Sequence, residues 1–294
     1  MPDLSQALTL AGKVLVVIGG TGGLGLSAAR AFVAAGSKVV AVGLHPESAE
    51  SARSQLGEAG HVLCADARES QTAALAVQAA LNHFGGFHGL YHVAGGSGRR
   101  WGDGPLHELT DEGWRATVEL NLTSVMYSNR AAVRQFLAQG SGGTVLDLGS
   151  VLASSPSPAY FDTHSYAAAK AALIGLTKAC AARYAVNDNR FNLLTTALVA
   201  TPMSARAQAD PVISRFVGTK QPLDGGRLGQ PSDLDAAAVY FMSDGSRFTT
   251  GQVLAVDGGW SVTEGRPEDP SSGVGNGEPE TAGNRTEARG GLCA

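Results

Sequence analysis

Cysteine is scarce in this sequence, with three residues among 294, and they stand far apart at Cys64, Cys180 and Cys293. No Cys-x-x-Cys pair occurs, which excludes the usual cysteine spacing of structural zinc sites and gives no sign of a disulfide framework. We therefore predict reduced thiols, a cytoplasmic location and no metal site.

Charge and long apolar runs are also in short supply. Only 16% of the residues are charged, the formal net charge is −4, and the basic residues form no cluster beyond Arg99-Arg100. This balance excludes the basic footprint of a nucleic-acid-binding protein. The first apolar run, Val14–Ile18, is far too short to cross a bilayer, and the chain begins with no signal-peptide pattern. We expect a soluble protein that binds neither nucleic acid nor a membrane.

What the sequence does contain is a regular alternation of short apolar runs and helical stretches. Seven runs predict strands, and they are Val14–Ile18, Lys38–Val42, His61–Ala65, His88–Ala94, Gly143–Gly149, Arg190–Thr195 and Gln252–Val256. The intervening helices are predicted to end near Ala35, to span Glu47–Leu56, Glu69–Phe84 and Thr110–Leu137, to open at Ser165, and to span Pro231–Ser243. Strands that alternate with helices imply right-handed βαβ units. We predict an α/β fold, a single doubly wound Rossmann-type domain with about seven parallel strands and helices on both faces.

This domain is predicted to span residues 1–262, because the composition changes after Val262. Residues 263–294 are rich in Gly, Pro, Glu, Ser and Arg and contain hardly any large apolar side chain. Such a segment cannot bury enough surface to offset the entropy of ordering it. We therefore predict a disordered tail over residues 263–294.

A glycine-rich loop, Gly19-Gly20-Thr21-Gly22-Gly23-Leu24-Gly25, directly follows the first predicted strand and opens the first predicted helix. At such a position glycines let the backbone turn tightly and approach a pyrophosphate, while the helix N-terminus adds free N–H groups. The strand–loop–helix context predicts a dinucleotide site, and a simple tight turn is the alternative.

Tyr166 and Lys170 stand four residues apart in a stretch whose Ala and Leu content predicts a helix. A helix places both side chains on one face, where a phenol and an ammonium form a usable acid–base pair. We expect the ammonium to favour the phenolate and so to lower the pKa of Tyr166. The same spacing also occurs by chance on solvated helices, so the pair gains its meaning from the glycine loop upstream.

The Gly-x-x-x-Gly-x-Gly spacing of the loop, together with the Tyr-x-x-x-Lys pair, resembles the short-chain dehydrogenase/reductase family. The resemblance covers roughly residues 8–262 and includes Asn121 in Asn-Leu-Thr-Ser, Ser150 just after the fifth predicted strand, and the closing run Thr250–Gly259. Within the family, the stretch around Tyr166 looks most like 3-oxoacyl-[acyl-carrier-protein] reductases. It implies an NAD(P)-dependent oxidoreductase that interconverts a ketone and a secondary alcohol by direct hydride transfer.

The resemblance implies a role for each of four catalytic residues. Tyr166 would be the general acid and base, and Lys170 would hold the nicotinamide ribose hydroxyls. Ser150 would donate a hydrogen bond to the substrate oxygen, and Asn121 would position a water that links Lys170 to solvent. The interval between Ser150 and Tyr166 is about three residues longer than is usual in the family, which makes Ser154 a rival for the serine role.

Cofactor contacts are implied for the glycine loop, for the ends of the second to fourth strands, for the catalytic helix and for the segment after the sixth strand. These residues are Gly19, Thr21, Gly23, Leu24, Gly25, His45, Asp66, Ala94, Gly95, Tyr166, Lys170, Val199 and Thr201.

Two departures from the family pattern affect this site. NAD-using members carry an acidic residue at the end of the second strand, where this chain has Gly43-Leu44-His45. The missing carboxylate favours NADP, although the only candidate partner for its phosphate there is His45, so NAD stays open. After the fourth strand, His92-Val93 replaces two amides that brace the central sheet in the family.

Two functions from different classes follow. The first is the NAD(P)-dependent oxidoreductase, with a small ketone or alcohol as substrate and a homotetramer or homodimer as its assembly. The alternative is a non-catalytic dinucleotide-binding sensor or scaffold with the same fold. Substrate identity is expected to depend on the loops Ser97–Leu109, Val151–Thr163 and Thr201–Gly226, the last of which is of a kind that closes over a site.

Overall fold

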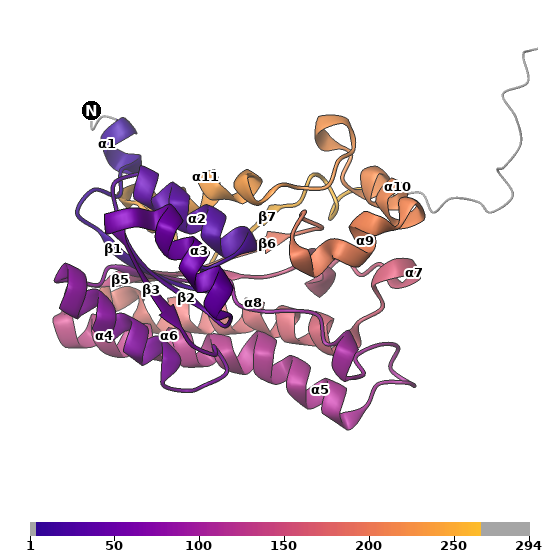
Figure 1. Cartoon of the computed structure of the whole chain (residues 1–294), viewed down its shortest axis with the longest axis horizontal. Coiled ribbons are helices and arrows are strands. Elements are labelled where there is room, and N and C mark those ends of the chain that lie inside the picture. Colours follow the sequence, from indigo (N-terminus) through magenta and orange to yellow (C-terminus); the bar gives the residue numbers. More distant parts are fainter. Residues whose placement is uncertain (1–3, 266–294) are drawn as a thin grey trace, which may run out of the picture.

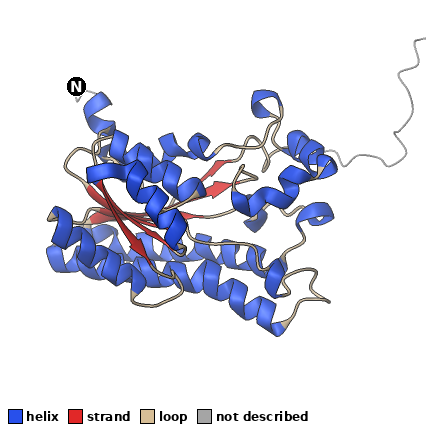
Figure 2. Cartoon of the chain, in the orientation of Figure 1, coloured by secondary structure: helices blue, strands red, loops and turns tan. Residues whose placement is uncertain are grey.

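A single seven-stranded parallel sheet lies at the centre of the computed structural model, which describes residues 4–265 (Figure 2). The strands are β1 (Val14–Ile18), β2 (Lys38–Gly43), β3 (Gly60–Cys64), β4 (Gly89–His92), β5 (Gly143–Leu148), β6 (Asn189–Thr196) and β7 (Val253–Val256). Their order is β3-β2-β1-β4-β5-β6-β7, so the chain builds outward from β1 in one direction and then from β4 in the other. The predicted α/β doubly wound fold is confirmed. Ligands of such sheets bind at the carboxyl ends of the strands where the direction changes, which here are β1 and β4.

Helices cover both faces of the sheet (Figure 1). One layer contains α2, α3 and α11, and the opposite layer contains α4, α6 and α8. The helices are α1 (Leu4–Leu8), α2 (Gly23–Ala34), α3 (Pro46–Leu56), α4 (Thr72–Phe84), α5 (Asp111–Val118), α6 (Ser124–Gln139), α7 (Pro158–Phe161), α8 (His164–Tyr184), α9 (Ala205–Ala209), α10 (Pro211–Lys220) and α11 (Asp235–Met242). Among residues 4–265, none of these helices combines the length and the apolar character needed to cross a membrane.

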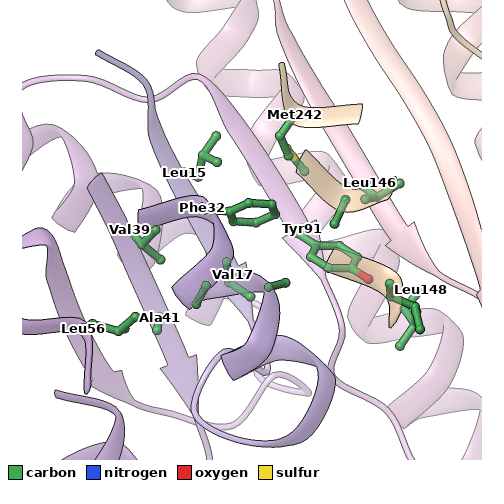
Figure 3. Close-up of a cluster of buried hydrophobic side chains, with 14 of the residues drawn as sticks. Leu15, Val17, Phe32, Val39, Ala41, Leu56, Tyr91, Leu146, Leu148 and Met242 are labelled. Carbon is green, nitrogen blue, oxygen red and sulfur yellow. The ribbon is translucent and has the colours of Figure 1, made fainter. Parts of the chain in front are cut away.

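Alternate residues of each central strand point to opposite helical layers. Leu15 and Val17 pack with Phe32 of α2, in the cluster shown in Figure 3, whereas Val16 and Ile18 pack in the cluster formed with α4 and α6. Both faces of β1 are therefore buried, which explains why its sequence is continuously apolar rather than alternating. Burial of this apolar area is the main force that holds the two layers on the sheet.

Strand β4 is shorter than predicted, while the bounds of the other strands differ from the prediction by no more than one residue. The strand predicted over His88–Ala94 ends at His92. The N–H groups of Val93 and Ala94 both donate to the carbonyl of Ile18, at 2.8 and 2.9 Å, so the chain leaves the ladder there. The early end opens the loop that faces the candidate site.

Helix α4 begins three residues later than predicted, at Thr72 rather than Glu69. A turn precedes it in which the Asp66 carboxylate accepts the N–H of Arg68 at 2.9 Å and the Thr72 hydroxyl donates to the Asp66 carbonyl at 2.6 Å. These side-chain bonds compete with the helix for the same backbone groups.

The helix predicted over Thr110–Leu137 is interrupted by a π-helical turn, Glu119–Thr123, between α5 and α6. Its start is as predicted, because the Thr110 hydroxyl accepts the N–H of Gly113 at 2.9 Å. The π turn contains Asn121, and such turns are frequent at functional sites. Nothing in the amphipathic pattern indicates this extra residue in the turn.

The predicted closing segment, Thr201–Gly226, contains α9 and α10. Ile213 and Phe216 of α10 form a separate apolar cluster with Trp260. Figure 1 shows α9 and α10 on the side toward which β6 and β7 run. Almost all of the predicted tail, residues 266–294, lies outside the described residues. Thr263 is described, and its hydroxyl donates to the Lys220 carbonyl at 2.8 Å.

Candidate active site

The glycine loop has the geometry of a phosphate cradle. Gly19 has φ +86° and Gly23 has φ +49°, backbone conformations that favour glycine. A Cβ on Gly25 would lie 2.0 Å from the Gly19 carbonyl oxygen, so the loop closes on itself only without side chains. Helix α2 starts directly from this loop and no side chain caps it. Its free N–H groups suit an anionic pyrophosphate, so these residues fit a dinucleotide.

Three of the predicted catalytic side chains meet at the ends of β5 and α8. Ser150 follows β5 and lines the same pocket as Tyr166 of α8. Lys170, one turn further along α8, is 3% exposed, and its ammonium donates to the Leu148 carbonyl at 2.8 Å. Ser154, the rival serine, is exposed and does not line this pocket.

The expected effect of Lys170 on Tyr166 is not found in this structure. Burial raises the pKa of the Tyr166 phenol above its ordinary value, and a hydrogen bond with Ser150 acts in the opposite direction. The Lys170 ammonium lies 5.8 Å from the centre of the Tyr166 ring, and its own pKa is lowered to about 8 by burial. The prediction that the ammonium lowers the pKa of Tyr166 is therefore wrong, because desolvation of the buried phenol decides the direction of its shift.

Asn121 is completely buried and braces the loop that follows β4. Its amide oxygen accepts the N–H of Gly96 at 3.0 Å, and its amide nitrogen donates to the carbonyls of Gly96 and Thr117, both at 2.9 Å. The implied contact with a water stays a prediction. Gly95, in the same loop, has space for no side chain, because a Cβ there would lie 2.9 Å from the Asn121 amide oxygen and 3.4 Å from the Lys170 nitrogen.

Asp103 is a site residue that the sequence analysis missed. Its two carboxylate oxygens accept the N–H groups of Ser165 and Tyr166 at 2.9 and 3.1 Å, and it is 5% exposed. A carboxylate at the first turn satisfies free N–H groups and opposes the positive end of the helix dipole. Asp103 thus fixes the start of α8 from 63 residues away. The sequence around the start of α8 cannot indicate a capping residue that comes from a distant loop.

His92 connects the end of β4 to α6 and to the loop that follows the strand. It is 1% exposed, its Nδ1 lies 2.8 Å from the Ser128 hydroxyl, and its Nε2 lies 3.1 Å from the Ala94 carbonyl. Burial lowers its pKa to about 3, with the charge of Lys170 acting in the same direction. The neutral ring therefore donates from Nε2 to Ala94 and accepts from Ser128.

Asp147 is a buried carboxylate of β5 that faces Asn129 of α6. One oxygen accepts the Asn129 amide at 2.7 Å, and the other has no hydrogen-bond partner within residues 4–265. Burial raises its pKa to about 7, while the Asn129 bond and the charge of Lys170 oppose the rise. The charge of Asp147 in turn raises the pKa of Lys170.

This carboxylate is expected to make stability depend on pH. Asp147 ionises near pH 3.8 in the unfolded chain and near pH 7 in the folded one, so the folded state loses stability as the pH rises between these values. Asp147→Asn lacks this loss. We expect its melting temperature, relative to wild type, to be about 5 °C higher at pH 7.5 than at pH 5. The exposed Asp188→Asn is the control, and an equal difference at both pH values would contradict the assignment.

The end of β2 has space for no side chain. A Cβ on Gly43 would lie 1.8 Å from the Thr21 hydroxyl oxygen and 2.7 Å from the Thr21 Cβ. Thr21 is 6% exposed, and its hydroxyl lies 3.1 Å from that of Ser48. His45 precedes α3 with an exposed side chain that makes no capping bond. The end of β2 is therefore occupied by the Thr21 hydroxyl, is followed by the exposed His45 imidazole, and carries no carboxylate.

The other predicted cofactor residues lie along the same edge of the sheet. Both carboxylate oxygens of Asp66 bind the Arg68 guanidinium, at 2.6 to 3.1 Å, which lowers the pKa of Asp66. A Cβ on Gly23 would lie 3.4 Å from the Thr201 methyl group, so Thr201 faces the glycine loop. Val199 is buried and forms an isolated parallel bridge with Gly229.

An apolar pocket opens above Ser150 and Tyr166. Its cavity measures about 240 Å³, and its apolar walls include Val151, Phe161 and Trp260. Two arginines, Arg99 and Arg206, also line it. No group of three or more His, Cys, Asp or Glu side chains that could hold a metal ion occurs in the described part of the chain.

Known proteins match most of this chain in sequence and in structure. The family model described as "Enoyl-(Acyl carrier protein) reductase" matches residues 19–261. The chain is 32% identical to cis-4-hydroxycyclohexanecarboxylate dehydrogenase of Sinomonas cyclohexanicum, over 85% of this chain and 97% of that protein. It is similar in structure to a short-chain type dehydrogenase/reductase from Mycobacterium ulcerans, with a TM-score of 0.79, 30% identity, and coverage of 87% of this chain and 92% of the other. It also resembles a gluconate 5-dehydrogenase from Burkholderia cenocepacia solved with NADP and tartrate, with a TM-score of 0.79, 27% identity, and coverage of 88% and 99%.

Proposed function

The chain belongs to the short-chain dehydrogenase/reductase family and is an NAD(P)-dependent oxidoreductase of secondary alcohols and ketones, in which we propose that Tyr166 is the general acid and base. The observation that carries this role is that Ser150 and Tyr166 line one apolar pocket, while Lys170, one turn further along α8, donates to the Leu148 carbonyl at the end of β5. The alternative of a non-catalytic sensor gains no support, because the relatives are named as dehydrogenases.

Each side chain has a task that follows from its place. In reduction, Tyr166 gives its proton to the substrate oxygen, and in oxidation it takes that proton back. Ser150 donates a hydrogen bond to the same oxygen, where negative charge develops. Lys170 would bind the ribose hydroxyls of a bound dinucleotide. Asn121 holds the loop that contains Gly95 close to Lys170, through its hydrogen bond with the Gly96 N–H. The bound dinucleotide supplies or accepts the hydride.

Two measurements test this function. Fluorescence titration with NADH and NADPH reports dinucleotide binding, and a panel of cyclic and open-chain ketones with the matching alcohols reports turnover. The relative from Sinomonas cyclohexanicum is named for a ring alcohol, so cyclohexanones form the first part of the panel. Dinucleotide binding without turnover of any compound would leave the sensor as the better description.

Of the two nicotinamide dinucleotides NAD and NADP, we propose NADP as the cofactor. The end of β2 carries no carboxylate to repel a 2′-phosphate, and the hydroxyls of Thr21 and Ser48 lie near it. The gluconate 5-dehydrogenase from Burkholderia cenocepacia contains NADP. A lower dissociation constant for NADH than for NADPH would overturn this preference. We also propose a cytoplasmic location, which the scarcity of cysteine supports.

A homotetramer or homodimer is the assembly we propose, with β7 at an interface. β7 is one of the two edge strands of the sheet, its Leu254 side chain is 40% exposed, and Phe248, six residues earlier in the chain, is fully exposed. Such apolar side chains beside an unpaired strand edge favour association with a second copy. We expect light scattering to show an oligomer for wild type and a smaller species for Leu254→Glu. Leu75→Glu, a change at another exposed leucine, on α4, is the control. A monomeric wild type would contradict the proposal.

A further inference from the structure

We propose that the substrate carries a carboxylate remote from the reacting carbon, and that Arg99 and Arg206 hold it at the mouth of the apolar pocket. This inference rests on the proposed oxidoreductase function and adds the chemical class of the substrate. It concerns residues that neither proton transfer nor the dinucleotide site uses.

The two arginines reach the pocket from different parts of the chain. Arg99 belongs to the loop after β4, and Arg206 belongs to α9 in the closing segment. Both guanidinium groups donate to one acceptor, the carbonyl of Tyr160, at 3.4 and 2.9 Å. Two cations therefore lie close together at the pocket, and the acceptor that they share, the Tyr160 carbonyl oxygen, carries no charge.

No carboxylate within residues 4–265 pairs with either cation at salt-bridge distance. Asp103 and Asp162, the two carboxylates whose charges act on Arg99, have other partners, since Asp103 caps α8 and Asp162 lies 3.1 Å from His164. Burial, together with the charge of Arg206, lowers the pKa of Arg99 from its usual value. An anion bound between the guanidinium groups would relieve their mutual repulsion.

The rest of the pocket defines the other end of the substrate. Val151, Phe161 and Trp260 form apolar walls around a cavity of about 240 Å³, while Ser150 and Tyr166 mark the reacting end. A substrate that satisfies both ends has a compact apolar body, of the size of a single ring, between a carbonyl group and a carboxylate. Guanidinium groups suit this carboxylate because their planar donors match its two oxygens.

The test compares 4-oxocyclohexanecarboxylate with its methyl ester, which has the same ring and carbonyl and no charge. With wild type and NADPH, we expect kcat/KM to be about 10- to 100-fold higher for the carboxylate, mostly through KM. In Arg99→Gln/Arg206→Gln this preference is expected to fall to less than about threefold, because both charge-assisted bonds are lost. Arg100→Gln is the matched control, since Arg100 is exposed, stacks on Trp101 at 4.0 Å and does not line the pocket.

The possible outcomes distinguish a failure of the carboxylate proposal from a failure of the oxidoreductase function on which it rests. Equal or better turnover of the ester by wild type overturns the carboxylate proposal and leaves the oxidoreductase function intact. The carboxylate proposal is also overturned if the double variant keeps the wild-type preference for the carboxylate. A double variant in which only the KM for NADPH rises overturns it as well, because the arginines would then not bind the substrate. Turnover of an acyl group on a carrier protein, without a preference for the free carboxylate, points to a macromolecular substrate instead. Failure of both ketones in an enzyme that still binds NADPH counts against the proposed function.

Discussion

Replacing Tyr166 with Phe is expected to lower kcat by about 10²- to 10⁴-fold, the range that a positioned general acid contributes. Phenylalanine keeps the ring that fills the wall of the pocket and removes only the hydroxyl that transfers the proton and bonds Ser150. Dinucleotide binding should stay within about threefold of wild type, because the cradle is formed by the glycine loop. Turnover and fluorescence titration on the same preparation separate these two effects.

The matched control for this variant is Tyr160→Phe. Tyr160 lies in the same region, its ring packs on Phe216 at a centroid distance of 4.7 Å, and only its backbone carbonyl meets the site. We expect this control to keep nearly all activity. A Tyr166→Phe variant that keeps more than about one tenth of wild-type kcat would remove Tyr166 from the proton-transfer role.

Gly43→Asp is expected to lower the affinity for NADH and NADPH alike by about 10-fold or more, although it restores the acidic residue of NAD-using relatives. The new Cβ would lie within 2.7 Å of three Thr21 atoms, including the Thr21 Cβ, so no rotation of the threonine side chain removes the clash. The glycine loop must shift instead, and the same loop forms the pyrophosphate cradle. Titration of both dinucleotides and a thermal melt measure the effect.

A second change should rescue this variant. Gly43→Asp/Thr21→Gly removes all three clashing atoms, so we expect dinucleotide binding to return with a preference for NADH, because the carboxylate binds the 2′-hydroxyl and repels a 2′-phosphate. Thr21→Gly alone is the control and should not prefer NADH, because the end of β2 still carries no carboxylate. If the single variant Gly43→Asp binds NADH as tightly as the double variant does, the contact with Thr21 does not limit this position.

Much of the fold could be predicted from the sequence, because its signals are local. The apolar run at β1 indicates a strand covered on both faces, and the glycine spacing indicates a turn that no side chain could occupy. The Tyr-x-x-x-Lys spacing places two side chains on one face of a helix regardless of what packs on it. The π turn at Asn121 was not predicted, since one extra residue in a turn leaves the amphipathic pattern almost unchanged.

The sequence by itself determined the α/β class, the phosphate loop and the pairing of Tyr166 with Lys170. Only the tertiary structure decided which groups from distant parts of the chain surround Tyr166 and Lys170. These groups, together with burial, determine the pKa values of the two side chains. Asp103 caps α8 across 63 residues, and the charge of Asp147 on β5 raises the pKa of Lys170 on α8. The pKa of Tyr166 is raised rather than lowered because burial is a property of the packed molecule. Spacing along a chain indicates which side chains can meet, whereas their charge depends on what the fold removes from water.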